Sequence, residues 1–448
     1  MGLRVKGNLL PAARADGTGR LRMNFRTTAL GMLLATSALL TASPALAQYG
    51  ARAQAPSVKD QPANSKDDAK QQKTLDISKQ VRPAIVELEA AVKAKDTANI
   101  PAKVAAALAK AKTANDRYLI SQLQLKGAVD ANDMPAAATA VEAMIATGVA
   151  PASELPGLYD SLGKIYFNAK AYDKAGAAFE KVTQLQPSNT EAMAMLAETR
   201  NSQGRIPEAV TMIQKAIATK SATGQKAEEN WYKRAVALSY NAHLPNAPEV
   251  AREWVGAYPN PKNWHDAIRI YQTATKAEDA SLLDSMRLAQ ATGGLSGESD
   301  YFRFANTLVN KGYAGEAKLV LEQGFAANAI SKTNPSFSQL YSVATAKSQG
   351  DRASLAASGK AAAAGPDVKK VMVVADAYYG YGDYAQAADL YRAALGKVGV
   401  DKDLANLRLG MTLVRSGDKA GATAALNAAG GAQTELAKLW LAYLGTKA

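Results

Sequence analysis

The segment LGKIYFNAKAYDKAGAAFEKVTQLQP, residues 162–187, indicates what kind of fold the chain adopts. A first helix is predicted by four residues spaced as i, i+3, i+4 and i+7, namely Tyr159, Leu162, Gly163 and Tyr166. A second helix follows a short polar break, with Ala175, Phe179 and Val182 at helical spacing and Pro187 where the helix must end. The segment is therefore predicted to be an antiparallel helix hairpin, in which Gly163 and Ala175 are small because the two backbones cross there.

The residues of this hairpin resemble the tetratricopeptide repeat (TPR), a helix–turn–helix unit of about 34 residues with the pattern W-x2-L-G-x2-Y, A-x3-F and P. Further units in phase with the pattern begin near Thr190, Glu228, Trp264, Tyr301, Val371 and Leu409. A single hairpin leaves one apolar face uncovered, so such units are stable only when neighbours stack on them. A series in phase is therefore stronger evidence than any one match.

The resemblance implies an all-α fold, a right-handed superhelical α-solenoid of roughly ten stacked hairpins. Residues 74–151 are expected to contain degenerate repeats, and residues 152–434 the TPR-like array, with a weaker unit at Leu340–Ala364. Residues 435–448, which include ELAKLWLAYL at Glu435–Leu444, are expected to form a solvent-facing capping helix.

From Met23 onward the sequence has the plan of a secretory signal peptide: one Arg, an apolar segment at Thr28–Leu40 and a small-x-small site ending at Ala47. The apolar segment is shorter than the ~20 residues that a membrane span needs. We therefore expect Met23 to be the true start, residues 1–47 to be removed, and the protein to be periplasmic or secreted. Residues 48–73 have few large apolar side chains and are expected to form a disordered linker.

The composition restricts the chemistry that the chain can perform. The 448 residues include no Cys and two His, His243 and His265, which excludes disulfide bonds, thiolate catalysis and Cys-ligated metal centres. Ser161–Lys164 matches an S-x-x-K nucleophile motif and Gly293–Gly297 is glycine-rich, but the companion motifs S-D-N, K-T-G and G-K-[ST] are absent. We expect no enzymatic activity, cofactor or metal. A carboxylate-based hydrolase is a third hypothesis, which needs two inward-facing carboxylates about 5–10 Å apart.

The charge indicates the class of partner. The net charge is +13, and it becomes +8 without the six basic residues and one acidic residue of positions 1–47. A basic protein favours anionic partners, and nucleic acid is not expected for an exported protein. We therefore predict a non-catalytic periplasmic scaffold for protein–protein interactions in cell-envelope assembly or secretion. The alternative is a basic groove that binds an anionic envelope glycan or polymer, and this binding should weaken more steeply with salt.

In TPR arrays the first helix of each hairpin lines the groove in which partners bind. The resemblance therefore implies a partner-binding groove at Asp160, Lys164, Asn168, Tyr232, Lys233, Tyr240, Phe302, Arg303, Asn306, Asn310, Asp376, Tyr379, Arg408 and Arg415. Tyr and Arg are the residue types that tend to carry binding energy.

The family members that grip a peptide C-terminus use Lys, Asn and Arg from three consecutive units. One unit here offers Glu198 and apolar residues at these positions, so a complete carboxylate clamp is not expected. Arg303, Asn306 and Asn310 share one helix face and could hold a carboxylate or a peptide amide. The alternative, that these side chains form only a hydrated groove wall, stays open.

Overall fold

The computed structural model describes residues 75–277 and 279–447, and this part of the chain contains helices and no strand. The predicted signal peptide and nearly all of the predicted linker lie outside the described residues. None of the described helices is long and apolar enough to cross a membrane.

The helices follow one another along the chain with the bounds α2 (Arg82–Lys93), α3 (Ile100–Lys110), α4 (Ala114–Asp130), α5 (Met134–Ala146), α6 (Leu155–Asn168), α7 (Tyr172–Leu185), α8 (Thr190–Ser202), α9 (Ile206–Ala222), α10 (Glu229–Asn241), α11 (Ala247–Ala257), α12 (Pro261–Ala274), α13 (Asp279–Thr292), α14 (Gly297–Asn310), α15 (Ala314–Ala326), α16 (Pro335–Ala364), α17 (Val368–Gly380), α18 (Tyr384–Leu395), α19 (Lys402–Ser416), α20 (Lys419–Asn427), the 3-10 turn η1 (Gly431–Gln433) and α21 (Thr434–Gly445). The all-α solenoid class predicted from the sequence is confirmed.

Within residues 75–447, nine pairs of consecutive described helices form hairpins, from α2/α3 to α14/α15 and then α17/α18 and α19/α20. The turn of every one of these hairpins holds a residue with positive φ: Lys95, Asn132, Lys170, Gly204, His243, Lys276, Gly312, Gly382 and Gly417. This left-handed conformation ends the first helix and reverses the chain, and glycine adopts it without a steric penalty. His243 is thus a turn residue.

The hairpin that decides the fold has the predicted crossing. A Cβ atom added to Gly163 on α6 would lie 2.6 Å from the ring of Phe179 on α7, so only glycine fits at this point. Ala175 is completely buried in the same interface. The contact of α6 with α7 that the sequence predicted is therefore confirmed, and Gly410 of α19 makes a similar close approach to Leu426 of α20.

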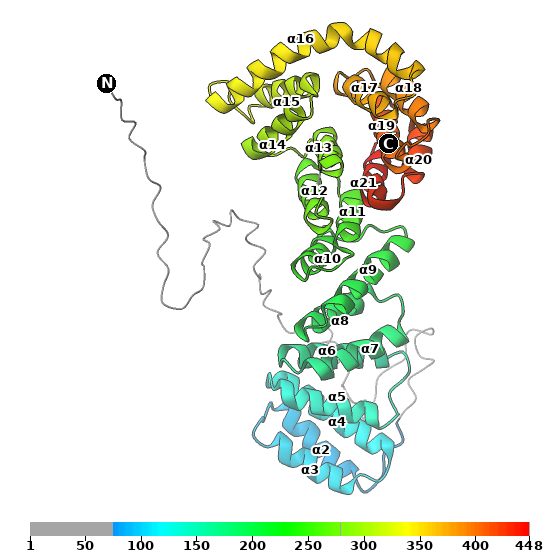
Figure 1. Ribbon diagram of the computed structural model, residues 1–448. Helices are drawn as coiled ribbons and strands as arrows, with labels where there is room; N and C mark the ends of the chain where they lie inside the picture. The colour runs from blue at the N-terminus through cyan, green and yellow to red at the C-terminus, as the bar shows by residue number, and fades with distance from the viewer. Residues whose placement is uncertain (1–74, 278, 448) are drawn as a thin grey trace, which may run out of the picture.

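The region of α16 differs from the prediction. The weaker unit expected at Leu340–Ala364 is part of one continuous helix of 30 residues, which passes over the array from α15 to α17 (Figure 1). The first half of α16 packs on α14 and α15 and its second half on α17 and α18. Its exposed middle, around Gly350, contributes nothing to the core.

After α16 the chain folds back on itself, and we call α17–α21 the C-terminal arm. In Figure 1 the arm lies beside α11–α15, with α17 in contact with α15 and α21 in contact with α11 and α13. The first helices of the arm thereby face the second helices of the preceding hairpins. One apolar cluster consequently extends from α8 and α9 through α10–α13 to α21.

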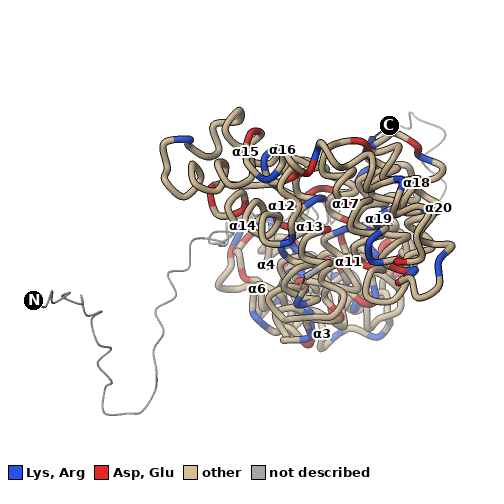
Figure 2. Tube along the Cα trace, turned by 45° about the horizontal axis from the view of Figure 1, so that its top comes forward, with Lys and Arg blue, Asp and Glu red and all other residues tan. Residues whose placement is uncertain are grey.

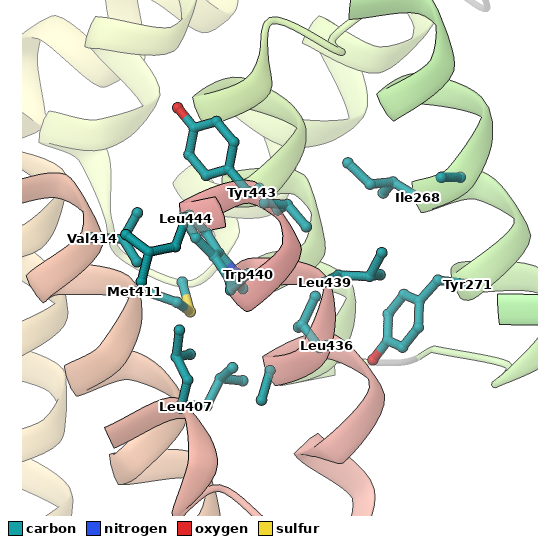
Figure 3. Close-up of a cluster of buried hydrophobic side chains, with 14 of the residues drawn as sticks. Ile268, Tyr271, Leu407, Met411, Val414, Leu436, Leu439, Trp440, Tyr443 and Leu444 are labelled. Carbon is teal, nitrogen blue, oxygen red and sulfur yellow. The ribbon is translucent and has the colours of Figure 1, made fainter. Parts of the chain in front are cut away.

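Helix α21 is also different from the solvent-facing cap that the sequence predicted. Trp440 is fully buried, and the Tyr443 hydroxyl donates a hydrogen bond of 2.6 Å to the carbonyl oxygen of Ala291. Figure 3 shows α21 side chains between Leu407 and Met411 of α19 and Tyr271 of α12. The prediction of a solvent-facing cap is wrong because α21 is apolar on nearly all sides, which is typical of a buried helix. Its position at the end of the array does not make it a cap.

Candidate functional site

Helices α6, α8, α10, α12 and α14 are the first helices of successive hairpins, and polar side chains link most of them. We call their uncovered side the first-helix face and define it by the residues Asp160, Lys164, Glu198, Arg234, His265, Arg269, Gln272 and Arg303. Arg234 on α10 donates two hydrogen bonds, of 2.8 and 2.7 Å, to the Glu198 carboxylate on α8. Arg303 on α14 donates a hydrogen bond of 3.2 Å to the Gln272 side chain on α12. The groove residues predicted from the sequence include Arg303 but not Arg234, Glu198 or Gln272.

The predicted groove residues on α6 lie at the surface. Lys164 and Asp160 form an ion pair of 2.7 Å one turn apart, and both side chains remain partly accessible. Asn168 is exposed at the C-terminal end of the helix. These three side chains are available to a partner, but the ion pair neutralises the lysine.

The predicted residues on α10 have mixed positions. Tyr232 is only 6% exposed and packs edge-on against Tyr258, with 5.7 Å between the ring centroids. Lys233 pairs with Glu229 at 3.1 Å, and Tyr240 is half-buried. We therefore assign Tyr232 to the packing of the hairpin and not to a partner-binding surface.

The predicted residues on α14 are the most accessible set. Phe302 is 41% exposed and its ring stands edge-on to Phe337 of α16. The Arg303 side chain is also 41% exposed and lies 3.9 Å from Asp300. Asn306 is partly exposed and Asn310 is exposed, so Arg303, Asn306 and Asn310 are accessible to solvent.

His265 fixes the loop between α13 and α14. Its Nδ1 atom lies 3.1 Å from the carbonyl oxygen of Gly294 and 3.2 Å from the Asp300 carboxylate, both of which accept hydrogen bonds. The hydrogen bond with Asp300 raises the pKa of His265, against the effect of burial. Asp300 also accepts from the Ser296 backbone N–H at 3.0 Å. His265 therefore holds the loop between α13 and α14, which contains most of the glycine-rich segment Gly293–Gly297.

The hollows beside these residues differ greatly in size. A cavity of about 10 Å³, lined among others by His265, Arg269 and Arg303, holds no more than one water molecule. A wider open depression of about 580 Å³ lies on α9, α10 and α11 and is lined by Gln214, Lys215, Ile217, Ala218, Tyr232 and Glu253. Neither lining combines a nucleophile with an adjacent base.

The S-x-x-K fragment has no catalytic geometry. The Ser161 hydroxyl donates to the carbonyl oxygen of Gly157 at 2.9 Å, and Lys164 is bonded to Asp160. Among the described residues, no group of three His, Cys, Asp or Glu side chains could hold a metal ion. Both fragments with enzyme-like sequences are thus accounted for by the repeat.

The predicted groove residues of the C-terminal arm lie inside the protein. Asp376 on α17 is 1% exposed and Arg408 on α19 is 7% exposed. Arg408 bonds Asp376 at 2.8 Å and Asp284 of α13 at 3.0 Å. Tyr379 is buried too, 4.8 Å below the guanidinium of Arg287. We therefore assign these side chains to the closure of the arm and not to an open groove.

Arg287 of α13 completes this arrangement, which we call the buried ionic cluster: Asp284, Arg287, Glu316, Asp376 and Arg408. Arg287 donates two hydrogen bonds, of 2.9 and 2.7 Å, to Glu316 of α15. It donates a third of 2.9 Å to Asp284. The hydroxyls of Tyr313 and Tyr391 donate to Asp376 at 2.7 and 2.6 Å. The cluster thus joins four helices, α13, α15, α17 and α19, and Tyr391 adds α18.

Burial and charge act in opposite directions in this cluster. Burial alone would lower the pKa of Arg287, but the carboxylates of Glu316 and Asp376 raise it well above its usual value. Burial alone would raise the pKa of Asp376, and Arg408 and Arg287 hold it below its usual range. Burial dominates at Glu316 and raises its pKa. Charged partners are therefore required for the cluster to remain ionised.

Arg415, the last predicted residue of the arm, is half-buried. Its Nε donates a hydrogen bond of 3.0 Å to the hydroxyl of Tyr384, over whose ring the guanidinium lies. It lies near the buried inner face of the arm and is held within the arm itself.

The stacked antiparallel hairpins define an all-α solenoid, a class of fold that presents extended surfaces to partners. Residues 166–222, from the end of α6 to the end of α9, match the family model for the tetratricopeptide repeat. This part of the chain is therefore similar to the tetratricopeptide repeat, the family that the sequence pattern predicted. Arrays of this family are typically non-catalytic scaffolds, and the fold supports a role in protein–protein interaction.

Comparison with known proteins adds little to the assignment of the fold. No curated protein matches the chain. One similar solved structure is described as Naa15/Naa10 bound to HypK-THB, with 14% identity, a TM-score of 0.26, and coverage of 80% of this chain and 65% of that chain. The chain thus spans less than two thirds of that relative. Another is the C-terminal part of a TPR repeat-containing protein from Cytophaga hutchinsonii, with 10% identity, a TM-score of 0.25, and coverage of 71% and 97%. At such TM-scores the path of the helices rests on this chain's own contacts.

Proposed function

We propose that this protein is an exported, non-catalytic scaffold that binds protein segments along its first-helix face. The plan of a secretory signal peptide at residues 23–47 supports export, and with it a periplasmic role in envelope assembly or secretion. N-terminal sequencing of the mature protein tests this part of the proposal. A chain that begins at Gln48 supports it, and a chain that retains residues 23–47 contradicts it.

One observation carries the binding role. The Asp376–Arg408 pair joins the first helices of two hairpins in the arm, as the Glu198–Arg234 pair does in the array. In the arm this face is covered by α13 and α15, and its ion pair is buried. In the array the side chains of Glu198 and Arg234 are 37% and 40% exposed. A face of this kind therefore receives helices within this molecule, and the copy on α6–α14 stays partly exposed in the part of the chain that the structure describes.

The charges of the first-helix face favour a polypeptide over a polyanion. Lys164 is paired with Asp160 and Arg234 with Glu198, which leaves Arg269 and Arg303 as the cations with least neutralisation. Figure 2 shows Lys and Arg interspersed with Asp and Glu along the helices. An anionic glycan would meet the carboxylates of Asp160 and Glu198 on this face, and each of them already pairs with one of its cations.

A site-specific photo-crosslinker in the full chain tests this role. We would place it at Arg269 on the first-helix face of α12, and at Thr211 on the second helix α9 as an exposed control. The proposal expects protein adducts from position 269 that are absent from position 211. Equal adducts at both positions would contradict it. Glycan that co-purifies and is released by high salt would instead support the polymer-binding alternative.

A further inference from the structure

Helix α16 contains the turn sequence of a hairpin in its middle. Ser348-Gln349-Gly350 repeats Ser202-Gln203-Gly204, which ends α8, and Gly350-Asp351 repeats Gly382-Asp383 and Gly417-Asp418. In each of these three turns the glycine has positive φ, and the next helix begins two residues after it. In α16 the same sequence lies within a continuous helix.

The lengths on either side of this turn sequence fit a hairpin. A turn centred on Gly350 would leave a first helix Pro335–Ser348 of 14 residues and a second helix Arg352–Ala364 of 13 residues. Helices α14 and α15, which form a hairpin, have 14 and 13 residues and the same three-residue connection. The sequence of α16 therefore has the dimensions of one complete repeat.

Gly350 has no packing role in the continuous helix. A Cβ atom added there would meet nothing within 4 Å, and the residue is exposed. By contrast, Gly359 in the same helix lies against the ring of Tyr378, where a Cβ would approach to 2.8 Å. Glycine is unfavourable in a helix interior unless a close contact requires it. A second conformation, in which residue 350 has positive φ, would explain why this position is a glycine.

Each half of α16 already has the neighbours that a helix of a hairpin would have. Phe337 and Leu340 pack in the cluster of α14 and α15, and Gly359 packs on α17. Bending at Gly350 would bring the two halves together and move the arm away from α11–α15. The contacts given up would include the Arg408–Asp284 pair, the Arg252–Glu435 pair of 2.9 Å and the bond of Tyr443 to Ala291.

We propose that α16 is a hinge with two states: the continuous helix, in which the arm is closed on α11–α15, and a hairpin, in which the array continues in line. The in-line state uncovers Asp376, Tyr379 and Arg408, which contact Asp284 and Arg287 of α13 in the closed state. A partner of this surface must replace what α13 supplies, namely a helix with an acidic residue and an Arg one turn apart, as Asp284 and Arg287 are. This inference is independent of what binds the first-helix face.

Spin labels on the full chain distinguish the two states. The sequence has no Cys, so Ser338→Cys and Lys360→Cys, both at exposed positions, would carry the only labels. They are separated by about 33 Å along a continuous helix, at about 1.5 Å per residue. In a hairpin they would approach to about 10–15 Å, because packed helix axes lie about 8–10 Å apart.

The expected result is a predominantly long distance in the otherwise native chain and an increase of the short-to-long ratio by about tenfold or more when Arg408→Met weakens the closure. Gly350→Ala should reduce the short-distance fraction in that background. Gly256→Ala, at another exposed helical glycine with open space around it, should leave the fraction unchanged. If Arg408→Met lowers the helical circular-dichroism signal, the milder variant Arg252→Glu, which breaks the Arg252–Glu435 pair, is used in its place. Adding Glu435→Arg reverses the charges of this pair and should restore the long distance. The long distance alone in both weakened variants would overturn the proposal.

Discussion

Gly163→Ala tests the helix crossing on which the fold prediction depends. The added Cβ would lie 2.6–2.7 Å from three ring atoms of Phe179, whereas carbon atoms in contact are about 3.5–4.0 Å apart. Phe179 is fully buried, so its ring cannot turn into solvent to relieve an overlap of about 1 Å. The helices must separate, and we expect a cost of about 1–3 kcal/mol. This outweighs the gain of up to about 1 kcal/mol that Ala normally has over Gly in a helix.

The assay must be local, because a long repeat array need not unfold in one step. We would measure hydrogen exchange of α6 and α7 in the variant, with Gly256→Ala as the matched control. The control position has open space, so its protection should be unchanged or increased. Phe179→Leu in the Gly163→Ala background should recover part of the lost protection, because the smaller side chain relieves the contact. Unchanged protection of α6 and α7 in Gly163→Ala alone would refute the crossing.

Three further predictions concern other parts of the molecule. Arg408→Leu leaves the carboxylates of Asp284 and Asp376 buried without one of their cations and should lower the stability of the arm by about 3–5 kcal/mol. The control Arg392→Ala, at an exposed side chain of α18, should change that stability by less than about 0.5 kcal/mol. Denaturant unfolding followed by hydrogen exchange in α17 and α19 checks both variants. Trp440→Ala should cost about 3–5 kcal/mol and lower the protection of α11 as well as α21, since the two helices pack together; equal protection of α11 in variant and native protein would contradict the closure of the arm. Burial alone would raise the pKa of Asp116, but hydrogen bonds from Ser78, Lys112 and Thr113 hold this pKa well below its usual value. The ionised Asp116 therefore stabilises the fold above the ordinary Asp pKa of about 3.9, and this stabilisation is lost as the pH falls below that value. Melting of native protein and Asp116→Asn between pH 7 and pH 3 should show a smaller pH dependence in the variant.

Local sequence patterns were sufficient for the hairpins. The spacing of Gly163, Ala175 and Phe179 determined the crossing of α6 and α7, because helix-to-helix contact within a hairpin depends on residues less than 20 positions apart. The family resemblance placed Asp376 and Arg408 in an open groove, but both side chains are buried against α13. What local spacing could not supply is the covering of that groove, because Asp284 is 124 residues away from Arg408 in the chain.

The structure of α16 explains why the closure could not be predicted. Its sequence has the turn and the helix lengths of an ordinary repeat, so the pattern predicts that the array continues in line past Gly350. Long-range contacts of the arm, from Arg252–Glu435 on α21 to Arg287–Asp376 on α17, favour the continuous helix. Of the groove residues predicted on α17 and α19, Asp376, Tyr379 and Arg408 are buried in the closed arrangement. An in-line array would leave them accessible, which stays a prediction. The largest discrepancy between the predicted and the observed arrangement therefore arises at α16. If this helix is the hinge that we propose, its conformation decides whether the protein offers one binding face or two.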